Sequence, residues 1–385
     1  MTVKNSEEEQ RLARLQQYLL VDPDNATLRA DVFDSALACG ALDEAQFQVT
    51  HALRLQPDQP GWLHRQSLLL IRQGQLTDAE AVLENLIAGG HDDPAIRYNL
   101  AYAQFAQGEN AKAIASVAPL LHGSDELAQL AWTLWLRCQH HLGQLTDALQ
   151  AFSDYVASGA GMSADVWGVA SLIALDAGRL PDAKNWSERA IKSHADQLEA
   201  LVARGSVALG EQDDVAAHRL FEHALKISLN DGRSWSGMAF TYMLQKDFAG
   251  ARTAFNKAVT AMPDHIGTWI GLGWCEFLSN RPDAARSAFA QALALDRNFA
   301  ESHGALAVAL VKLGEQGQAK MELDVALKLD PKSLSARYAQ AMLNGEVDDP
   351  AKFLSMTKRV LAQHPAPGST DTSLTLADVV LRHKR

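Results

Sequence analysis

The chain has 385 residues, of which 47% are hydrophobic, and 46 acidic against 35 basic residues give it a formal net charge of −11 at pH 7. This acidic balance argues against a general nucleic-acid binder or a protein of anionic membrane surfaces. The three cysteines are widely scattered and lack a CxxC spacing, so neither a disulfide framework nor a zinc site is indicated.

The N-terminal segment carries no apolar stretch of signal-peptide length, and no later window approaches the ~18 apolar residues of a membrane span. We therefore expect a cytoplasmic location without membrane insertion. Ser6, followed by three glutamates, predicts a helix start, because acidic residues are favourable at a helix N-terminus. Leu12, Leu15 and Tyr18 then form an apolar stripe. Residues 1–25 are predicted to form a capping helix that covers the helices beginning at residue 26.

From residue 26 onward a pattern of 34 residues recurs, and it is clearest in residues 232–265. There, apolar residues spaced by three and four positions line one face of each of two helices. The turn between the helices falls at residues 245–247, and Pro263 stops the second helix because proline cannot continue it. One unit is therefore a helical hairpin.

The same template fits nine consecutive units, with only Ala128 and Ser163 inserted between them. The units are residues 26–59, 60–93, 94–127, 129–162, 164–197, 198–231, 232–265, 266–299 and 300–333. Alanine occupies the twentieth position of every unit, at Ala45, Ala79, Ala113, Ala148, Ala183, Ala217, Ala251, Ala285 and Ala319. A small side chain there lets the two helices approach closely.

These features resemble the tetratricopeptide repeat: the 34-residue period, tryptophan at the fourth position, a small residue at the eighth, the recurring alanine and the closing proline. The resemblance covers residues 26–333. It implies an all-α fold, an α-solenoid in which about nine to ten helical hairpins form a right-handed superhelix, and binding of peptides or proteins as the activity.

The domain organisation follows from these units. The loop that ends unit four, at residues 157–163, predicts a boundary between units one to four (residues 26–162) and units five to nine (residues 163–333). Residues 334–364 are expected to form a degenerate terminal repeat, with a first helix at 334–343 and a second that opens at Pro350. Residues 365–385 are expected to be a flexible basic tail.

No arrangement of residues predicts catalysis, so we expect a protein that is not an enzyme and needs no cofactor or metal. His140 and His141 are adjacent and would point about 100° apart on a helix, which suits a metal site poorly. Gly267, Gly271 and Gly273 lie within a helix rather than in a phosphate-binding loop. Cys275 is expected to be a small apolar helix residue.

Positions two, five, nine and twelve of each first helix, with six and thirteen at the edge, are expected to line the concave groove that the resemblance implies. The candidate partner-binding residues at these positions are Arg65, Tyr98, Asn99, Tyr102, Phe105 and Arg137 in units two to four, and Phe240, Met243, Ile270, Trp274, Phe277, Val308 and Val311 in units seven to nine. The first set is basic and aromatic and the second is apolar, as interaction surfaces commonly are. Alternatively, contacts within the superhelix or the C-terminal tail bury the apolar set, and the polar set is a solvated face.

Arg65 and Asn99 occupy sixth positions of adjacent units and resemble the carboxylate clamp of chaperone-binding repeats, but the second positions, Gly61 and Ala95, lack its lysine. We predict a non-enzymatic scaffold or adaptor that binds a protein or peptide segment in the groove and no nucleic acid. The alternative is a regulatory or assembly subunit of a larger enzyme or secretion complex. The sequence leaves the oligomeric state and the identity of the partner open.

Overall fold

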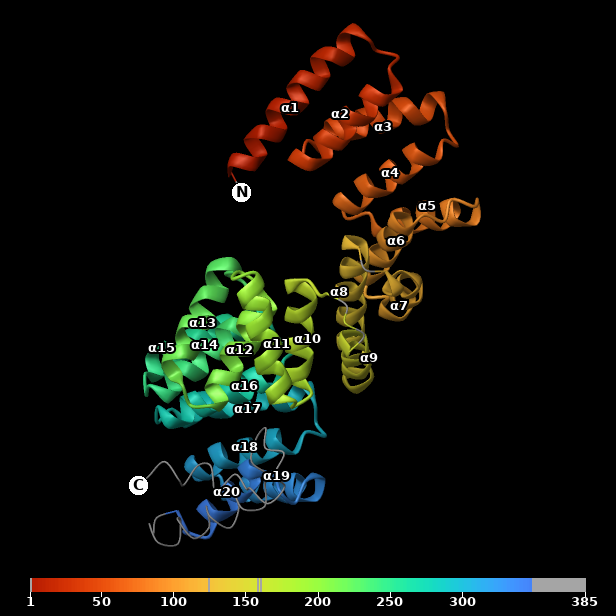
Figure 1. Cartoon of the computed structure of the whole chain (residues 1–385). Helices are drawn as coiled ribbons and strands as arrows, with labels where there is room; N and C mark the ends of the chain where they lie inside the picture. The colour runs from red at the N-terminus through yellow and green to blue at the C-terminus, as the bar shows by residue number, and fades with distance from the viewer. Residues whose placement is uncertain (1, 124, 158, 160, 348–385) are drawn as a thin grey trace. The chain divides into compact units, whose positions relative to one another are not determined.

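The computed structural model describes residues 2–123, 125–157, 159 and 161–347. Within this part of the chain every regular element is helical. The helices are α1 (Thr2–Val21), α2 (Ala26–Cys39), α3 (Leu42–Leu55), α4 (Pro60–Arg72), α5 (Leu76–Ala88), α6 (Pro94–Ala106), α7 (Asn110–Val117), the 3-10 helix η1 (Ala118–His122), α8 (Glu126–His141), α9 (Leu145–Ala157), α10 (Ala164–Asp176), α11 (Leu180–Ser193), α12 (Leu198–Gly210), α13 (Asp214–Ile227), α14 (Gly232–Leu244), α15 (Phe248–Ala261), α16 (Ile266–Leu278), α17 (Pro282–Leu295), α18 (Ala300–Lys312), α19 (Gln316–Leu329) and α20 (Leu334–Leu343) (Figure 1).

Each of the nine predicted units contains a pair of α-helices, with η1 added in unit three, so the prediction of an all-α solenoid of helical hairpins is confirmed. By its contacts the chain divides into two compact units, Met1–Met162 and Ser163–Arg385. Within each of them, the first helix of a hairpin packs against the second, and the second packs against the first helix of the next hairpin. At the division the Ser163 side chain accepts a hydrogen bond from the Val166 backbone N–H at 3.3 Å and so caps α10.

The contact between the two helices of each unit depends on two columns of residues. All nine alanines of the twentieth position are fully buried. The residues of the twenty-fourth position are buried as well, and two of the phenylalanines there pack on a glycine of their own unit: an added Cβ at Gly205 would lie 2.8 Å from the Phe221 ring, and one at Gly273 would lie 2.3 Å from Phe289. The polar exception, Ser187, is also fully buried, and its hydroxyl donates to the Lys184 carbonyl oxygen at 2.9 Å.

The turn inside every unit has the same backbone geometry. Its fifteenth position has a left-handed backbone in all nine units. Glycine, which adopts positive φ without steric cost, holds this position in units one to five and in unit nine. In units six to eight the position is held by Gln212, Lys246 and Asn280, with φ of 60°, 62° and 56°.

Unit three departs from the regular pattern. Pro119 has no N–H to continue the α-helix, and α7 therefore ends at Val117 and passes into the short 3-10 helix η1. The next helix, α8, begins at Glu126, three residues before the start at 129 that the template predicted. The Asp125 side chain causes this early start, because it caps α8 by accepting from the Ala128 N–H at 2.9 Å.

The N-terminal helix α1 packs on unit one, although two details of its prediction were wrong. It begins at Thr2, so Ser6 lies inside the helix rather than at its start. Leu12 and Leu19 are buried against α2 and α3, with Leu15 packed beside them, whereas Tyr18 is 61% exposed. Leu19 thus occupies the buried position that the sequence pattern assigned to Tyr18. The second helix expected from Pro350 and the tail at 365–385 lie outside the described residues.

The packing of α1 predicts different effects of mutation at its buried and its exposed positions. Leu12→Ala should lower the free energy of unfolding by about 2–3 kcal/mol, because it removes a buried side chain and leaves a cavity. Tyr18→Ala should change it by less than about 0.5 kcal/mol. Thermal unfolding followed by circular dichroism measures both. Equal losses in the two variants would show that α1 packs through a different face.

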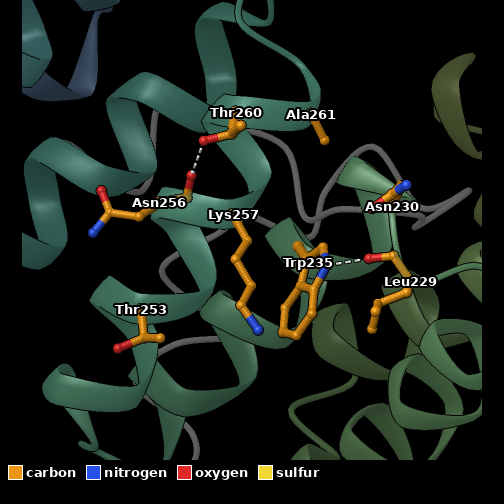
Figure 2. Close-up of a pocket in the computed structure, with 8 residues that line it drawn as sticks. All are labelled: Leu229, Asn230, Trp235, Thr253, Asn256, Lys257, Thr260 and Ala261. Atoms are coloured by element: carbon orange, nitrogen blue, oxygen red, sulfur yellow. Dashed lines mark hydrogen bonds between the residues drawn. The ribbon is translucent and has the colours of Figure 1, made fainter.

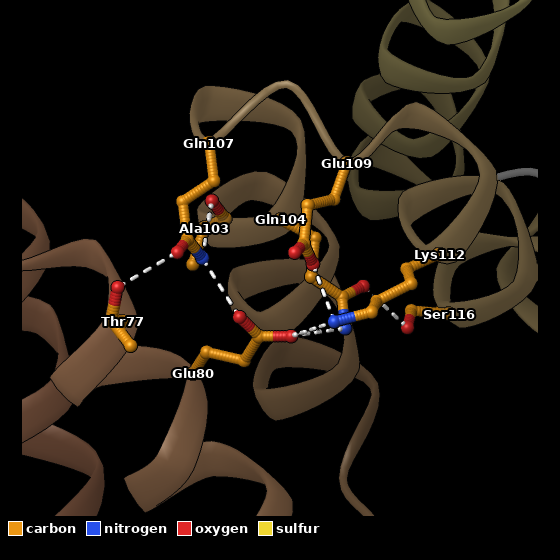
Figure 3. Close-up of polar contacts among 8 residues, drawn as sticks. All are labelled: Thr77, Glu80, Ala103, Gln104, Gln107, Glu109, Lys112 and Ser116. Atoms are coloured by element: carbon orange, nitrogen blue, oxygen red, sulfur yellow. Dashed lines mark hydrogen bonds and ion pairs between the residues drawn. The ribbon is translucent and has the colours of Figure 1, made fainter.

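A polar network joins units two and three (Figure 3). The carboxylate of Glu80, only 8% exposed, accepts hydrogen bonds from Gln104 Nε2 at 3.1 Å and Gln107 Nε2 at 2.8 Å, and Lys112 Nζ lies 3.4 Å away. Ser116 Oγ donates to Gln104 Oε1 at 2.8 Å and so orients that amide. Burial alone would raise the pKa of Glu80, but the two amide donors and the ammonium group outweigh it, so the pKa lies below its ordinary value.

Glu80→Ala should therefore destabilise the protein by about 1–3 kcal/mol at neutral pH, because the buried amide of Gln104 and the half-buried amide of Gln107 lose their acceptor. A lowered pKa means that the ionised form contributes stability above the unfolded pKa of about 4.3, and this contribution is lost as pH falls through the folded value. The difference between wild type and variant should shrink accordingly when urea unfolding is repeated at progressively lower pH. Glu84→Ala, an exposed glutamate on the same helix, is the control. A difference that does not vary with pH would contradict an ionised Glu80.

Candidate functional site

A groove of about 630 Å³ runs along the first helices of units one to three, α2, α4 and α6. Its lining residues are Asp34, Leu37, Ala38, Leu68, Ile71, Arg72, Tyr98, Asn99 and Tyr102. They are positions nine, twelve and thirteen of units one and two, and positions five, six and nine of unit three. Tyr98, Asn99 and Tyr102 come from the residues predicted for partner binding. The residues of α2 were missed, although the same positional rule, applied one unit earlier, points to them.

The charges of this groove are unequal. Arg65 makes two hydrogen bonds to the Asp34 carboxylate, at 3.0 and 2.8 Å, and its guanidinium lies 5.3 Å from the centre of the Trp62 ring. Asp34 is thereby neutralised. Arg72 is exposed, and in the described part of the chain its only hydrogen bond is a long one, 3.4 Å, to the Leu37 carbonyl oxygen. The groove therefore carries an uncompensated positive charge at Arg72.

The polar wall between α4 and α6 is formed by two half-buried residues. Asn99 Nδ2 lies 2.9 Å from His64 Nε2. Burial is the main cause that lowers the pKa of His64, so its neutral ring accepts a hydrogen bond from the Asn99 amide. Burial likewise raises the pKa of Tyr98, a shift that the charge of Arg137 partly offsets. The Tyr98 hydroxyl thus remains a neutral hydrogen-bonding group, and Tyr102, 43% exposed, stands beside it in the groove.

Phe105 and Arg137, the other predicted residues of this half, lie further along the same row of helices. The Phe105 ring meets His141 edge-on at 5.5 Å between centroids. Arg137, on α8, is half-buried. Neither residue lines the groove of units one to three, so the structure brings together three of the six predicted residues in that groove and places Arg65 at its edge, bonded to Asp34.

The apolar set of units eight and nine is packed against the chain itself. Trp274 and Phe277, on α16, meet edge-on at 5.7 Å, and Tyr338 of α20 lies 6.0 Å from the first ring and 6.5 Å from the second. Trp274 also meets the core residue Phe289 at 5.7 Å. Trp274 and Phe277 are half-buried and do not face an empty groove, because the Tyr338 ring of α20 packs against them.

The remaining predicted residues of this half differ in exposure. Val308 is fully buried beneath α20, so it does not face an empty groove either. Ile270 and Val311 pack against the core formed by α17, α18 and α19. Phe240 is 39% exposed, although its ring meets Phe255 edge-on at 5.1 Å, and Met243 packs at the margin of the core around Phe255.

Close packing of α20 on α18 explains this difference between the two ends. Gly304 lies so near the backbone of α20 that an added Cβ would be 2.4 Å from the Ala336 nitrogen. The Glu301 carboxylate also accepts from the first N–H groups of α20, at Leu334 (2.7 Å) and Ser335 (3.2 Å). This close packing of α20 on α18 lets the ring of Tyr338 reach α16, two units away. The sequence alone did not indicate it.

A second hollow, of about 810 Å³, lies beside Trp235 in unit seven (Figure 2). The Trp235 indole N–H donates to the Leu229 carbonyl oxygen at 2.8 Å, and Lys257 Nζ lies 3.8 Å from the ring centroid. The fourth position makes the same bond to the carbonyl oxygen six residues earlier in units eight, nine and ten. The pairs are Trp269 with Pro263 (2.7 Å), His303 with Arg297 (2.9 Å) and Arg337 with Pro331 (3.0 Å). This recurrence assigns Trp235 a structural role at the loop between units.

Comparison with known proteins agrees with this repeated geometry. Models of the tetratricopeptide repeat match residues 64–123 and residues 231–298, in both compact units of the chain. The chain is a tetratricopeptide repeat protein. Repeats of this family are protein-interaction modules. Among the described residues of this tetratricopeptide protein, no helix has the length and apolarity to cross a membrane.

Individual relatives are distant. The Protein CTR9 homolog of Arabidopsis thaliana is 22% identical over 140 residues, which are 36% of this chain and only 13% of that protein. The crystal structure of the APC/C hetero-tetramer Cut9-Hcn1 aligns with a TM-score of 0.58 at 15% identity, over 82% of this chain and 62% of that one. A tetratricopeptide repeat protein from Parabacteroides merdae aligns with a TM-score of 0.46 at 16% identity, over 65% of this chain and 98% of that one. At 15% identity the likeness to the Cut9-Hcn1 structure concerns the fold alone.

The buried cysteines of this tetratricopeptide protein are poor nucleophiles. Burial raises the pKa of Cys138 and of Cys275 to about 11. Both side chains therefore remain protonated thiols at neutral pH and pack as small apolar groups, because the thiolate is the reactive form.

The covered position of Trp274 leads to a test by mutation. Trp274→Ala should lower the free energy of unfolding by about 3 kcal/mol, because it removes the ring that joins α16, α17 and α20. Leu278→Ala, at a site 53% exposed on the same helix, should cost less than about 0.5 kcal/mol. Thermal unfolding of both variants decides the point. A Trp274→Ala protein as stable as Leu278→Ala would mean that α20 does not hold the ring.

Proposed function

We propose that the protein is a non-enzymatic adaptor that binds an extended segment of a partner protein in the groove of α2, α4 and α6. The open space beside Tyr98 and Tyr102 is the observation that carries this proposal. The groove combines apolar lining residues, Leu37, Leu68 and Ile71, with the hydrogen-bonding groups of Tyr98, Asn99 and Tyr102. Ligand sites of proteins commonly have this composition and a volume of this order.

Electrostatics favours a partner segment with acidic character at this groove. Because Arg65 neutralises Asp34, the charge that an incoming chain meets is that of Arg72. The body of the protein is acidic overall, so a locally positive groove directs an acidic segment to this surface rather than to its surroundings. Tyr102 offers an exposed ring of the type that often dominates binding energy at interfaces.

Arg72 and Tyr102 are the two residues whose substitution tests binding in the groove. Tyr102→Ala and Arg72→Glu should each weaken partner binding by roughly tenfold or more and leave helicity and the unfolding midpoint nearly unchanged. Arg54→Glu, the same charge change at an exposed position of α3, is the matched control. Affinity capture followed by mass spectrometry, with these proteins as baits, measures the effect on whichever protein the wild type retains.

The outcome also separates the adaptor from the alternative role as a subunit. A client that is lost with Arg72→Glu and kept with Arg54→Glu supports the groove as its binding site. A stoichiometric complex that survives both groove variants would favour a regulatory or assembly subunit that is held through other surfaces, and would contradict the proposal.

A further inference from the structure

Units one to three, at the N-terminal end of the array, and units eight to ten, at the other end, use equivalent positions of their first helices. The two ends can therefore be compared residue by residue. The ninth and twelfth positions of the first unit in each set are Asp34 and Leu37 at one end, and Trp274 and Phe277 at the other. In both sets the fifth position of the third unit is a tyrosine, Tyr98 or Tyr338. The tyrosine at this position thus lines a groove together with Asp34 and Leu37 at one end, and packs against two aromatic rings at the other.

The rings of Trp274, Phe277 and Tyr338 fill the groove of units eight to ten with edge-to-face and tilted contacts at 5.7 to 6.5 Å. This is the separation at which aromatic pairs are favourable. At the other end Asp34 and Leu37 leave the corresponding space beside Tyr98 empty, and it is part of the 630 Å³ groove. One end of the protein therefore displays the packing that the other end lacks.

The middle unit determines whether the helices close over this space. Gly304, at the fifth position of unit nine, lets α20 pack directly on α18. The equivalent residue of unit two is His64, whose ring bonds Asn99 at 2.9 Å and stands between α4 and α6. These two helices barely touch. The imidazole ring thus lies at the position where Gly304 admits a helix at the other end, and the groove beside it is open to a partner.

We infer that the groove of units one to three binds a peptide through an aromatic side chain, which occupies beside Tyr98 and Tyr102 the space that Trp274 and Phe277 fill at the other end, with an acidic residue next to it that pairs with Arg72. This rests on the proposed function and specifies its ligand. The aromatic ring meets the two tyrosines and the apolar residues Leu68 and Ile71. The acidic residue pairs with Arg72, the one charge of the groove that no carboxylate of the described residues neutralises.

The test uses fluorescein-labelled peptides of sequence Gly-Asp-X-Asp-Gly, with X as Trp, Leu or Ala, and a Gly-Lys-Trp-Lys-Gly peptide as charge control. Fluorescence anisotropy measures their binding to the full-length protein. The Asp-Trp-Asp peptide should bind at least tenfold more tightly than the Ala peptide and the Lys-Trp-Lys peptide. In the filled variant Asp34→Trp/Leu37→Phe, which copies the other end, this advantage should disappear.

Two controls keep the result interpretable. Asp34→Asn removes the ion pair with Arg65 without filling the groove, and should retain the preference for Trp. Circular dichroism of the filled variant checks its helicity, and Tyr102→Ala gives a second route to lost binding if that variant does not fold.

The possible failures are distinct. Equal binding of the Trp, Leu and Ala peptides, abolished by filling, would overturn the aromatic specificity and leave the groove as the binding site. Equal binding of the Lys and Asp peptides would overturn the pairing with Arg72. Binding that filling and Tyr102→Ala both leave unchanged, or no binding of any peptide, would overturn the inference together with the proposed groove.

Discussion

The close approach of two helices at a fully buried alanine is the constraint on which the rest of this structure depends. All nine hairpins have it, and the neighbouring buried position carries the residue that packs on the first helices of its own and the next unit. Phe221 illustrates this, since it lies against both Gly205 and Gly237. Because this packing uses one side of each first helix, the opposite side, with positions five, nine and twelve, remains available for the groove.

Whether that side forms an open groove or a second core is determined by a few residues. Gly304 admits the backbone of α20, and the ring of Tyr338 then reaches Trp274 two units away. His64 occupies the equivalent place near the N-terminus and bonds Asn99 instead. One repeated scaffold thus yields a closed, aromatic end and an open, positively charged one, and the difference arises from side-chain size rather than from a change of fold.

Much of the fold was predictable from the sequence because the unit is local. A 34-residue period with fixed alanines determines both helices of a hairpin and the neighbouring helices on which they pack. Within the repeats it did not predict η1 or the early start of α8, which are caused by Pro119 and Asp125. The groove was predictable in part, since helix periodicity identifies the side of a helix that faces it. Periodicity cannot tell whether another helix covers that side. Trp274 was assigned to an open surface because its covering residue is 64 positions away in the chain.

The left-handed position in each turn has a consequence for how the units tolerate mutation. A residue other than glycine at such a position costs about 1 kcal/mol or more, and units six to eight carry this cost at Gln212, Lys246 and Asn280. In an array whose stability is a sum of local terms, this cost stays within the hairpin that carries it. Gly40 keeps the turn of unit one free of the cost, so a substitution of Gly40 would add it to the hairpin whose first helix lines the groove.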